Sequence, residues 1–200
     1  MEDFFPRDFH FSIFPTKNLS SHHETILEQI ESIERKAFPK NEVMPIKDEI
    51  TKKSNTMLIA YYYEEPNQKL NKRENNNITR KNLSRKQQAN NNNIRESQKI
   101  KIAGYIIYSL LYSAHSLPIT RIIKLCIHTS LRKKGLGTRL LEMCLGRTGV
   151  PEKSRAELHV DVQRKDAINL YRKVGFEIYG DLLENYYEIG RDAWFMVLVK

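Results

Sequence analysis

The chain has 200 residues, enough for one domain with a sizeable core, and 40% of them are hydrophobic. The formal net charge is +9, but residues 67 to 99 contain nine basic and two acidic residues, so the remainder is nearly neutral. The charge is therefore weak evidence for a nucleic-acid partner. Two cysteines, both in apolar surroundings, indicate neither a disulfide framework nor a zinc site of their own.

The first residues are acidic and contain no long apolar run. We therefore expect no signal peptide and no membrane-spanning segment. A cytoplasmic location is the default expectation, and a nuclear one is the alternative.

The N-terminal part predicts two strands with helices between them. Phe9 to Pro15 alternates in the manner of a strand, and apolar residues from Ile26 to Ala37 recur at helical spacing. A short helix is expected around Ile46 to Lys53, and a strand over Met57 to Tyr63.

Residues 67 to 99 hold ten Asn and almost no apolar side chains to bury. We expect a disordered insertion in a surface loop, with a functional basic tether as the alternative. The flanking segments are clear strands, so residues 1 to 200 are expected to form a single domain interrupted by this insertion.

The C-terminal part alternates strands and helices. The expected strands are Lys101 to Tyr112, Ile119 to Ile127, Ala156 to Val162, Phe176 to Leu182 and Trp194 to Val199. One helix is expected after Gly135, and another ends at Gly175. The predicted order is β-α-α-β-β-β-α-β-α-β-β, an α/β (α+β) fold with a mostly antiparallel sheet.

A basic glycine loop joins the strand that ends at Ile127 to the next helix. It reads Arg132-Lys133-Lys134-Gly135-Leu136-Gly137-Thr138. Backbone N–H groups at a helix N-terminus, together with the helix dipole, attract phosphate. Gly135 and Gly137 would let a pyrophosphate approach, and either is able to adopt a positive φ. The loop matches neither common nucleotide-binding glycine motif.

Several motifs in order resemble the GNAT superfamily of N-acetyltransferases. Arg132 to Gly137 fits R/Q-x-x-G-x-G/A, the coenzyme A pyrophosphate motif of that family, and Leu-His-Val-Asp-Val follows from residue 158. Ala167 to Phe176 is similar to the family's A-x-x-L-Y-x-x-x-G-F helix end. The segment from Asn185 to Ala193 resembles the last hairpin of protein N-terminal acetyltransferases, including those acting on ribosomal proteins. Ile33 to Pro39 is a weaker match.

The resemblance implies acetyl-CoA as cosubstrate, an amine as acceptor, direct transfer and no metal. His159 is then the candidate general base, with a strand histidine at a sheet surface as the alternative. Asp161, on the same face of the strand, is a candidate to share that work or to tune His159, with a solvated carboxylate at the strand end as the alternative. Tyr171 is the candidate acid for the departing thiolate, with a core aromatic as the alternative.

The resemblance also implies cofactor and acceptor contacts. The strand edge Leu125, Cys126 and Ile127 is expected to hold the pantetheine arm through its backbone, and Cys126 is not expected to be a nucleophile. Arg164 stands where many members carry an Asn that contacts the cofactor. The expected cofactor contacts are Leu125, Cys126, Ile127, Arg132, Lys133, Lys134, Gly135, Leu136, Gly137, Thr138, Arg164 and Tyr171; the expected acceptor walls are Phe38, Pro39, Tyr186 and Tyr187.

The favoured acceptor is the N-terminal α-amine of a protein or peptide, because the Tyr186–Tyr187 hairpin is associated with peptide N-terminus binding in the family. The alternatives are a lysine side chain, a small-molecule amine, or a non-catalytic acyl-CoA-binding module. No specific nucleic acid and no membrane partner are expected. The sequence leaves open an auxiliary subunit.

Overall fold

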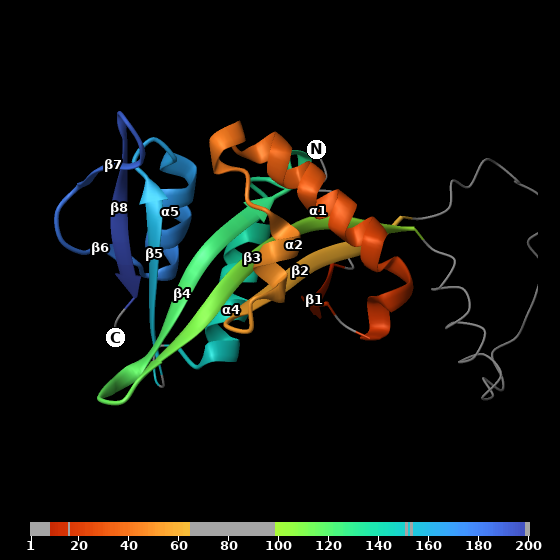
Figure 1. Cartoon of the computed structure of the whole chain (residues 1–200), viewed down its shortest axis with the longest axis horizontal. Coiled ribbons are helices and arrows are strands. Elements are labelled where there is room, and N and C mark those ends of the chain that lie inside the picture. Colours follow the sequence, from red (N-terminus) through yellow and green to blue (C-terminus); the bar gives the residue numbers. More distant parts are fainter. Residues whose placement is uncertain (1–8, 16, 65–98, 151, 153, 199–200) are drawn as a thin grey trace, which may run out of the picture.

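A computed structural model describes residues 9–15, 17–64, 99–150, 152 and 154–198 (Figure 1). The insertion predicted at residues 67 to 99 lies outside the described residues, apart from Lys99. No helix in the described ranges is both long and apolar enough to span a membrane.

Eight strands form one sheet in the order β1-β2-β3-β4-β5-β8-β6, with β7 also paired to β8. All neighbours are antiparallel except β4 and β5. In chain order the elements are β1 (His10–Phe14), α1 (His23–Ala37), α2 (Ile46–Thr51), β2 (Asn55–Tyr63), β3 (Ile100–Ser113), β4 (Ser116–Ile127), α4 (Leu136–Thr148), β5 (Arg155–Asp161), α5 (Lys165–Val174), β6 (Glu177–Ile178), β7 (Leu183–Glu188) and β8 (Arg191–Leu198). Short 3₁₀ turns are η1 (Lys17–His22), η2 (Lys40–Glu42) and η3 (Thr129–Leu131).

Helices cover both faces of the sheet (Figure 1). α1 and α2 pack on one face, where Ile26 and Ile30 of α1 are fully buried. α4 and α5 pack on the other face, where Leu140 and Leu141 of α4 are fully buried. The central strands β2 and β3 are therefore buried on both sides, which explains their nearly continuous apolar sequences.

β4 and β5 separate partway along their length. They pair only from Ile119 to Ile122 of β4, and within the described residues the rest of β4, up to Ile127, has no strand on that side. The backbone N–H and C=O groups along this edge are not used by the sheet. The divergence therefore leaves a gap in the middle of the sheet with free backbone on one wall.

An extra residue in β4 coincides with this gap. Ile122 pairs with Tyr108 and Lys124 with Ile107, which leaves Ile123 as a β-bulge. After the bulge, Lys124 lies against α1 through Glu34, and Leu125 packs on the α4 side. The bulge thus determines which side chains at the end of β4 face the α1 layer and which face the α4 layer.

The predicted fold class is confirmed, and the observed element order follows the predicted one with one addition. The strand expected from Phe176 to Leu182 is only two residues long, β6, and β7 follows as a separate strand. Gly180, with φ of 78°, turns the chain away between them. The end of α5 is as predicted, because Gly175 has φ of 109° and caps it.

Candidate active site

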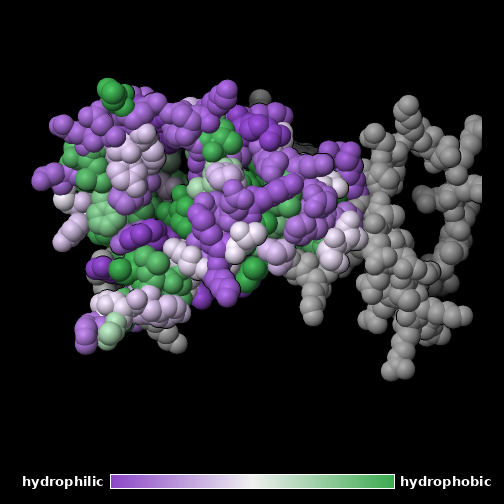
Figure 2. Space-filling view, viewed as in Figure 1, coloured by the Kyte–Doolittle hydropathy of each residue, from purple (hydrophilic) through white to green (hydrophobic). Residues whose placement is uncertain are grey.

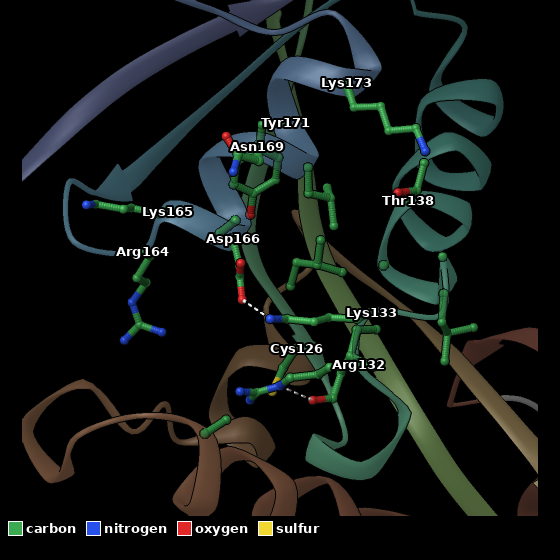
Figure 3. Close-up of a pocket in the computed structure, with 18 of the residues that line it drawn as sticks. Cys126, Arg132, Lys133, Thr138, Arg164, Lys165, Asp166, Asn169, Tyr171 and Lys173 are labelled. Carbon is green, nitrogen blue, oxygen red and sulfur yellow. Dashed lines mark hydrogen bonds and ion pairs between the residues drawn. The ribbon is translucent and has the colours of Figure 1, made fainter.

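A cleft of about 870 Å³ opens between the β4 edge, the N-terminus of α4 and one side of α5 (Figure 3). This volume suits a cofactor-sized ligand. Most of the predicted cofactor contacts line it. The lining includes Phe38, Leu125, Cys126, Ile127, Arg132, Lys133, Gly135, Leu136, Gly137, Thr138, Arg164 and Tyr171.

The two glycines of the loop before α4 have different roles. Gly135 has φ of 76°, and a Cβ added there would meet nothing within 4 Å, so it supplies both the turn and open space. Gly137 is helical, and its Cβ would lie 2.8 Å from Leu170 Cδ1 of α5. Gly137 therefore allows α4 and α5 to pack closely, and the positive φ belongs to Gly135 and to Lys133, with φ of 59°.

The N-terminus of α4 presents N–H groups to the cleft. The first bond of the helix runs from Arg139 N–H to Gly135 C=O, at 3.0 Å, so the preceding N–H groups of the turn have no helical partner. Lys133 and Asp166 come from opposite walls of the cleft and form an ion pair, with 3.6 Å between Lys133 Nζ and Asp166 Oδ2 (Figure 3). Free N–H groups, the helix dipole and nearby basic side chains are the features that attract phosphate, which agrees with the role predicted for this turn.

Arg132 bends back toward the β4 edge, where its Nε donates to the Ile127 carbonyl at 3.1 Å. Lys134 is exposed and is not among the residues lining the cleft. Asn169 and Lys173 of α5 line it but were not predicted. Both lie inside the A-x-x-L-Y-x-x-x-G-F helix end but at positions that the motif leaves open, so only their place on the helix could have indicated them.

His159 lies on the other face of β5 from the cofactor cleft. Its strand neighbours Leu158 and Val160 are buried under α4 and α5, so alternation directs the imidazole to the opposite side. The ring stacks on Tyr186, with centroids 4.6 Å apart, and tilts against Phe195 at 5.0 Å. Burial, aided by Arg121, lowers the pKa of His159 and favours the neutral form that accepts a proton.

Tyr171 points from α5 into the cleft (Figure 3) and is itself buried. Burial raises its pKa to about 12, so the hydroxyl stays protonated at neutral pH. Its ring packs edge-on against Phe176 at 5.9 Å. The geometry suits a proton donor facing the cleft.

The β7–β8 hairpin carries Tyr186 and Tyr187. Asn185 has φ of 53°, and its backbone N–H donates to the Asp192 carboxylate at 2.8 Å, which fixes the irregular turn of β7 ahead of the tyrosines. Burial, with smaller effects from Tyr186 and Tyr171, raises the pKa of Tyr187. The hairpin therefore reaches the vicinity of Tyr171 from the side of His159.

Several large hydrophobic side chains are exposed in and near this hairpin, and some green, hydrophobic surface is visible in the same part of the molecule (Figure 2). They are Tyr179, Leu182, Tyr186 and Ile189.

The opposite wall comes from the connection after α1. Phe38 lines the cleft, and Lys124 Nζ and the Arg164 guanidinium lie 3.6 and 4.6 Å from the centre of its ring. Pro39 is exposed and is not among the lining residues.

Sequence reasoning missed an ion-pair network beside this wall. Glu42 pairs with Arg164 and with Arg191, and Arg191 also pairs with Asp161. Asp161, considered as a helper of His159, is fully buried and is instead the partner of Arg191 and of the Gln163 N–H. No local pattern marks Glu42 and Arg191, because they are far apart in the sequence.

The comparisons with known proteins agree with the fold. Residues 56–176 match the model of the Acetyltransferase (GNAT) family. Among curated proteins, none matches the sequence significantly. Among solved structures, NAA60 of Arabidopsis thaliana in complex with a bisubstrate analogue has a TM-score of 0.61 at 15% identity, over 96% of this chain and 99% of that chain.

Two further solved structures share the fold. Naa50 of Arabidopsis thaliana in complex with the bisubstrate analogue CoA-Ac-MVNAL has a TM-score of 0.58 at 20% identity, over 94% of this chain and 97% of that chain. The ribosomal-protein-S18-alanine N-acetyltransferase of Escherichia coli has a TM-score of 0.58 at 17% identity, over 96% of this chain and 93% of that chain.

The family match covers more than half of the chain, and it includes the glycine loop, the divergent β4 edge and the helix end that carries Tyr171. The cosubstrate expected from the sequence fits the cleft, since the glycine-containing turn before α4 and the unpaired edge of β4 both line it. The chain therefore belongs to the GNAT family of acetyltransferases, and it is an acetyl-CoA-dependent N-acetyltransferase.

Proposed function

We propose that this enzyme acetylates the N-terminal α-amine of a protein or peptide. One observation carries the proposal: α4 and α5 line the cofactor cleft from one face of the sheet, while His159 lies on the other face, beside the point where β4 and β5 separate. An amine entering beside Tyr186 would reach the gap from one face, while the thioester reaches it from the other. This is the arrangement that direct attack in a ternary complex requires.

His159 has the role of general base in this proposal. A neutral amine is the nucleophile, so an ammonium must first lose a proton, and the imidazole is the side chain on the acceptor side whose pKa suits that task. The stacked Tyr186 holds the ring plane without consuming either ring nitrogen. The imidazole thus accepts the proton directly or through one water.

Tyr171 and the β4 edge act on the thioester side. Acetyl-CoA supplies the acetyl group as a thioester. The N–H groups of the unpaired edge from Leu125 to Ile127 are placed to hold the thioester carbonyl. The Tyr171 hydroxyl, protonated at neutral pH, is placed to give its proton to the departing sulfur.

Cys126 lines the cleft but is a poor nucleophile. Burial raises the pKa of its thiol to about 12, with Glu34 adding to the effect, so the thiolate is scarce at neutral pH. This supports transfer without an acyl-enzyme.

The acceptor class is supported by the aromatic residues near the two sides of the gap. Phe38 lines the cleft and the Tyr186–Tyr187 hairpin lies against His159, and rigid aromatic walls of this kind suit an extended peptide end. Two of the solved relatives were captured with bisubstrate analogues, one of which carries the sequence MVNAL, and a third acts on an alanine of ribosomal protein S18.

The test is acetyl transfer from labelled acetyl-CoA to a library of peptides with free N-termini. A matched library has blocked N-termini and one internal lysine. We expect transfer to the free α-amines only, with a preference for particular first residues. Transfer to the blocked, lysine-bearing peptides, or only to small amines, would contradict the proposal.

A further inference from the structure

The entrance to the acceptor site is flanked by two segments far apart in the sequence. One is the η2 turn after α1, which carries Glu42, and the other is the β7–β8 hairpin, in which Arg191 is the first residue of β8. The first follows the Phe38 wall and the second follows the Tyr186–Tyr187 wall. Whatever fixes the distance between these segments fixes the width of the entrance.

Glu42 and Arg191 join the two segments directly. Each oxygen of the Glu42 carboxylate has its own partner: Arg191 Nη1 on one, and Arg164 Nη2, at 2.8 Å, on the other. A second link runs beside the first, from Asn41 Nδ2 to the Glu188 carboxylate at 2.6 Å. The backbone carbonyl of Glu42 also accepts a hydrogen bond from Lys124 Nζ, at 2.9 Å, which ties the turn to β4.

Arg191 connects this turn to the catalytic strand. Its Nη2 pairs with Asp161, two residues after His159 on the same face of β5, and its guanidinium lies 5.7 Å from the centre of the Tyr187 ring. Only 17% of the Arg191 side chain and 10% of the Glu42 side chain are exposed. A pair so far removed from water is less screened than a surface pair and more rigid.

We infer that Glu42 and Arg191 form a clasp that sets the width of the acceptor entrance, and that both are positioning residues for the acceptor amine. The expected effect on kinetics rests on the proposed function. The Glu42–Arg191 contact itself belongs to the fold and does not depend on the acceptor. Arg164 also pairs with the Glu42 carboxylate and lines the cofactor cleft. The same carboxylate therefore fixes the position of the acceptor wall relative to the cofactor cleft. The clasp touches no reacting atom.

Glu42→Gln is the informative variant, because it removes the charge, keeps the size and leaves Arg191 its Asp161 and Glu188 partners. Arg191→Met would instead strand the buried Asp161 carboxylate and endanger folding. We expect Glu42→Gln to raise the KM for a free-amine peptide about tenfold with kcat nearly unchanged, and to raise the KM for acetyl-CoA much less, because Arg164 keeps its contact with the Phe38 ring. Glu31→Gln, which breaks the more exposed Glu31–Arg35 pair on α1, is the matched control and should leave all three constants unchanged.

Hydrogen exchange of the protein alone provides a readout that needs no acceptor. Loss of the clasp should speed amide exchange in both η2 and the β7–β8 hairpin of Glu42→Gln, and in neither segment of Glu31→Gln. An unchanged peptide KM, or an equal rise in the KM for acetyl-CoA, would overturn the inference. If the wild-type enzyme acetylates only small amines, the proposed acceptor is wrong and hydrogen exchange alone tests the clasp. Faster exchange in both η2 and the β7–β8 hairpin of Glu42→Gln would then support the clasp. Faster exchange in η2 alone would refute it.

Discussion

The imidazole of His159 and the phenol ring of Tyr186 are stacked, with centroids 4.6 Å apart and ring planes inclined by 14°. The two residues belong to strands that are not neighbours, since β8 pairs with both β5 and β7 and contributes Phe195 beside the imidazole. His159 is thus oriented by ring packing. The hairpin that forms the acceptor wall therefore also sets the direction of the candidate base.

His159→Phe separates the stacking from the proton transfer. The variant keeps a flat ring against Tyr186 and removes both ring nitrogens, so the fold should persist while kcat falls about a hundredfold or more. The KM for acetyl-CoA should stay the same, because His159 does not line the cofactor cleft. Steady-state kinetics would check this, and wild-type turnover across roughly pH 6 to 9 would rule out the base assignment.

The titration of His159 should reflect its surroundings. Burial lowers its pKa, Arg121 lowers it further and Glu157 opposes them, so the imidazole should stay neutral to a pH below the ordinary value of 6.5. Protonation, and with it loss of the base, should set in only as the pH falls below that value. Arg121→Met should raise the pKa of His159 and shift the titration to higher pH, because it removes one of the two effects that lower this pKa and leaves Glu157 in place.

NMR titration of the imidazole is the suitable measurement, because an acceptor α-amine titrates itself near about pH 8 and complicates the rate profile. A midpoint at or above 6.5 in the wild-type protein would contradict the expected direction.

Tyr171→Phe tests the proton donor. The ring should keep its packing against Phe176, so the melting temperature should change little, while kcat should drop about tenfold or more for want of an acid. Tyr179→Phe is the control, since that tyrosine is 66% exposed and belongs to no part of the cleft. Equal kcat values for the two variants would show that Tyr171 serves packing alone.

Gly135→Ala and Gly146→Ala test two glycines in different settings: Gly135 in the turn before α4 and Gly146 inside α4. At Gly135 a side chain must adopt φ of 76°, which costs roughly 1–2 kcal/mol and distorts the phosphate turn, so the KM for acetyl-CoA should rise. Gly146 lies within α4 with open space around it, so alanine there should stabilise the helix by about 0.5–1 kcal/mol. Thermal unfolding and steady-state kinetics with acetyl-CoA would distinguish the two variants. The same KM for acetyl-CoA in both variants would refute the role of Gly135.

Local patterns predicted most of the fold and the cofactor side. The glycine loop and the helix end at Gly175 depend on backbone conformations that only a few residue types adopt, so their sequences are informative by themselves. The buried strands were equally clear, because β2 and β3 are apolar along nearly their full length. The single domain and the catalytic roles of His159 and Tyr171 remain predictions.

The acceptor side depends on contacts between distant segments, which no local pattern encodes. The orientation of Lys124 could not be decided from the sequence, because the bulge at Ile123 reverses the alternation of β4 just before it. Likewise, Glu42 reads as one more acidic residue in a turn until the fold brings Arg191 to it. The brevity of β6 follows from the turn at Gly180 and from the competition of β7 for the same edge of β8.

The divergence of β4 and β5 places an open strand edge in the interior of a sheet. Unpaired edges are templates for pairing with another chain, and proteins usually cover them. An extended pantetheine arm would cover this edge in the way an added strand does. Cosubstrate binding should therefore protect the protein against self-association as well as supply the acetyl group, and at a hundred times its Kd it would add about 2.7 kcal/mol to the free energy of unfolding.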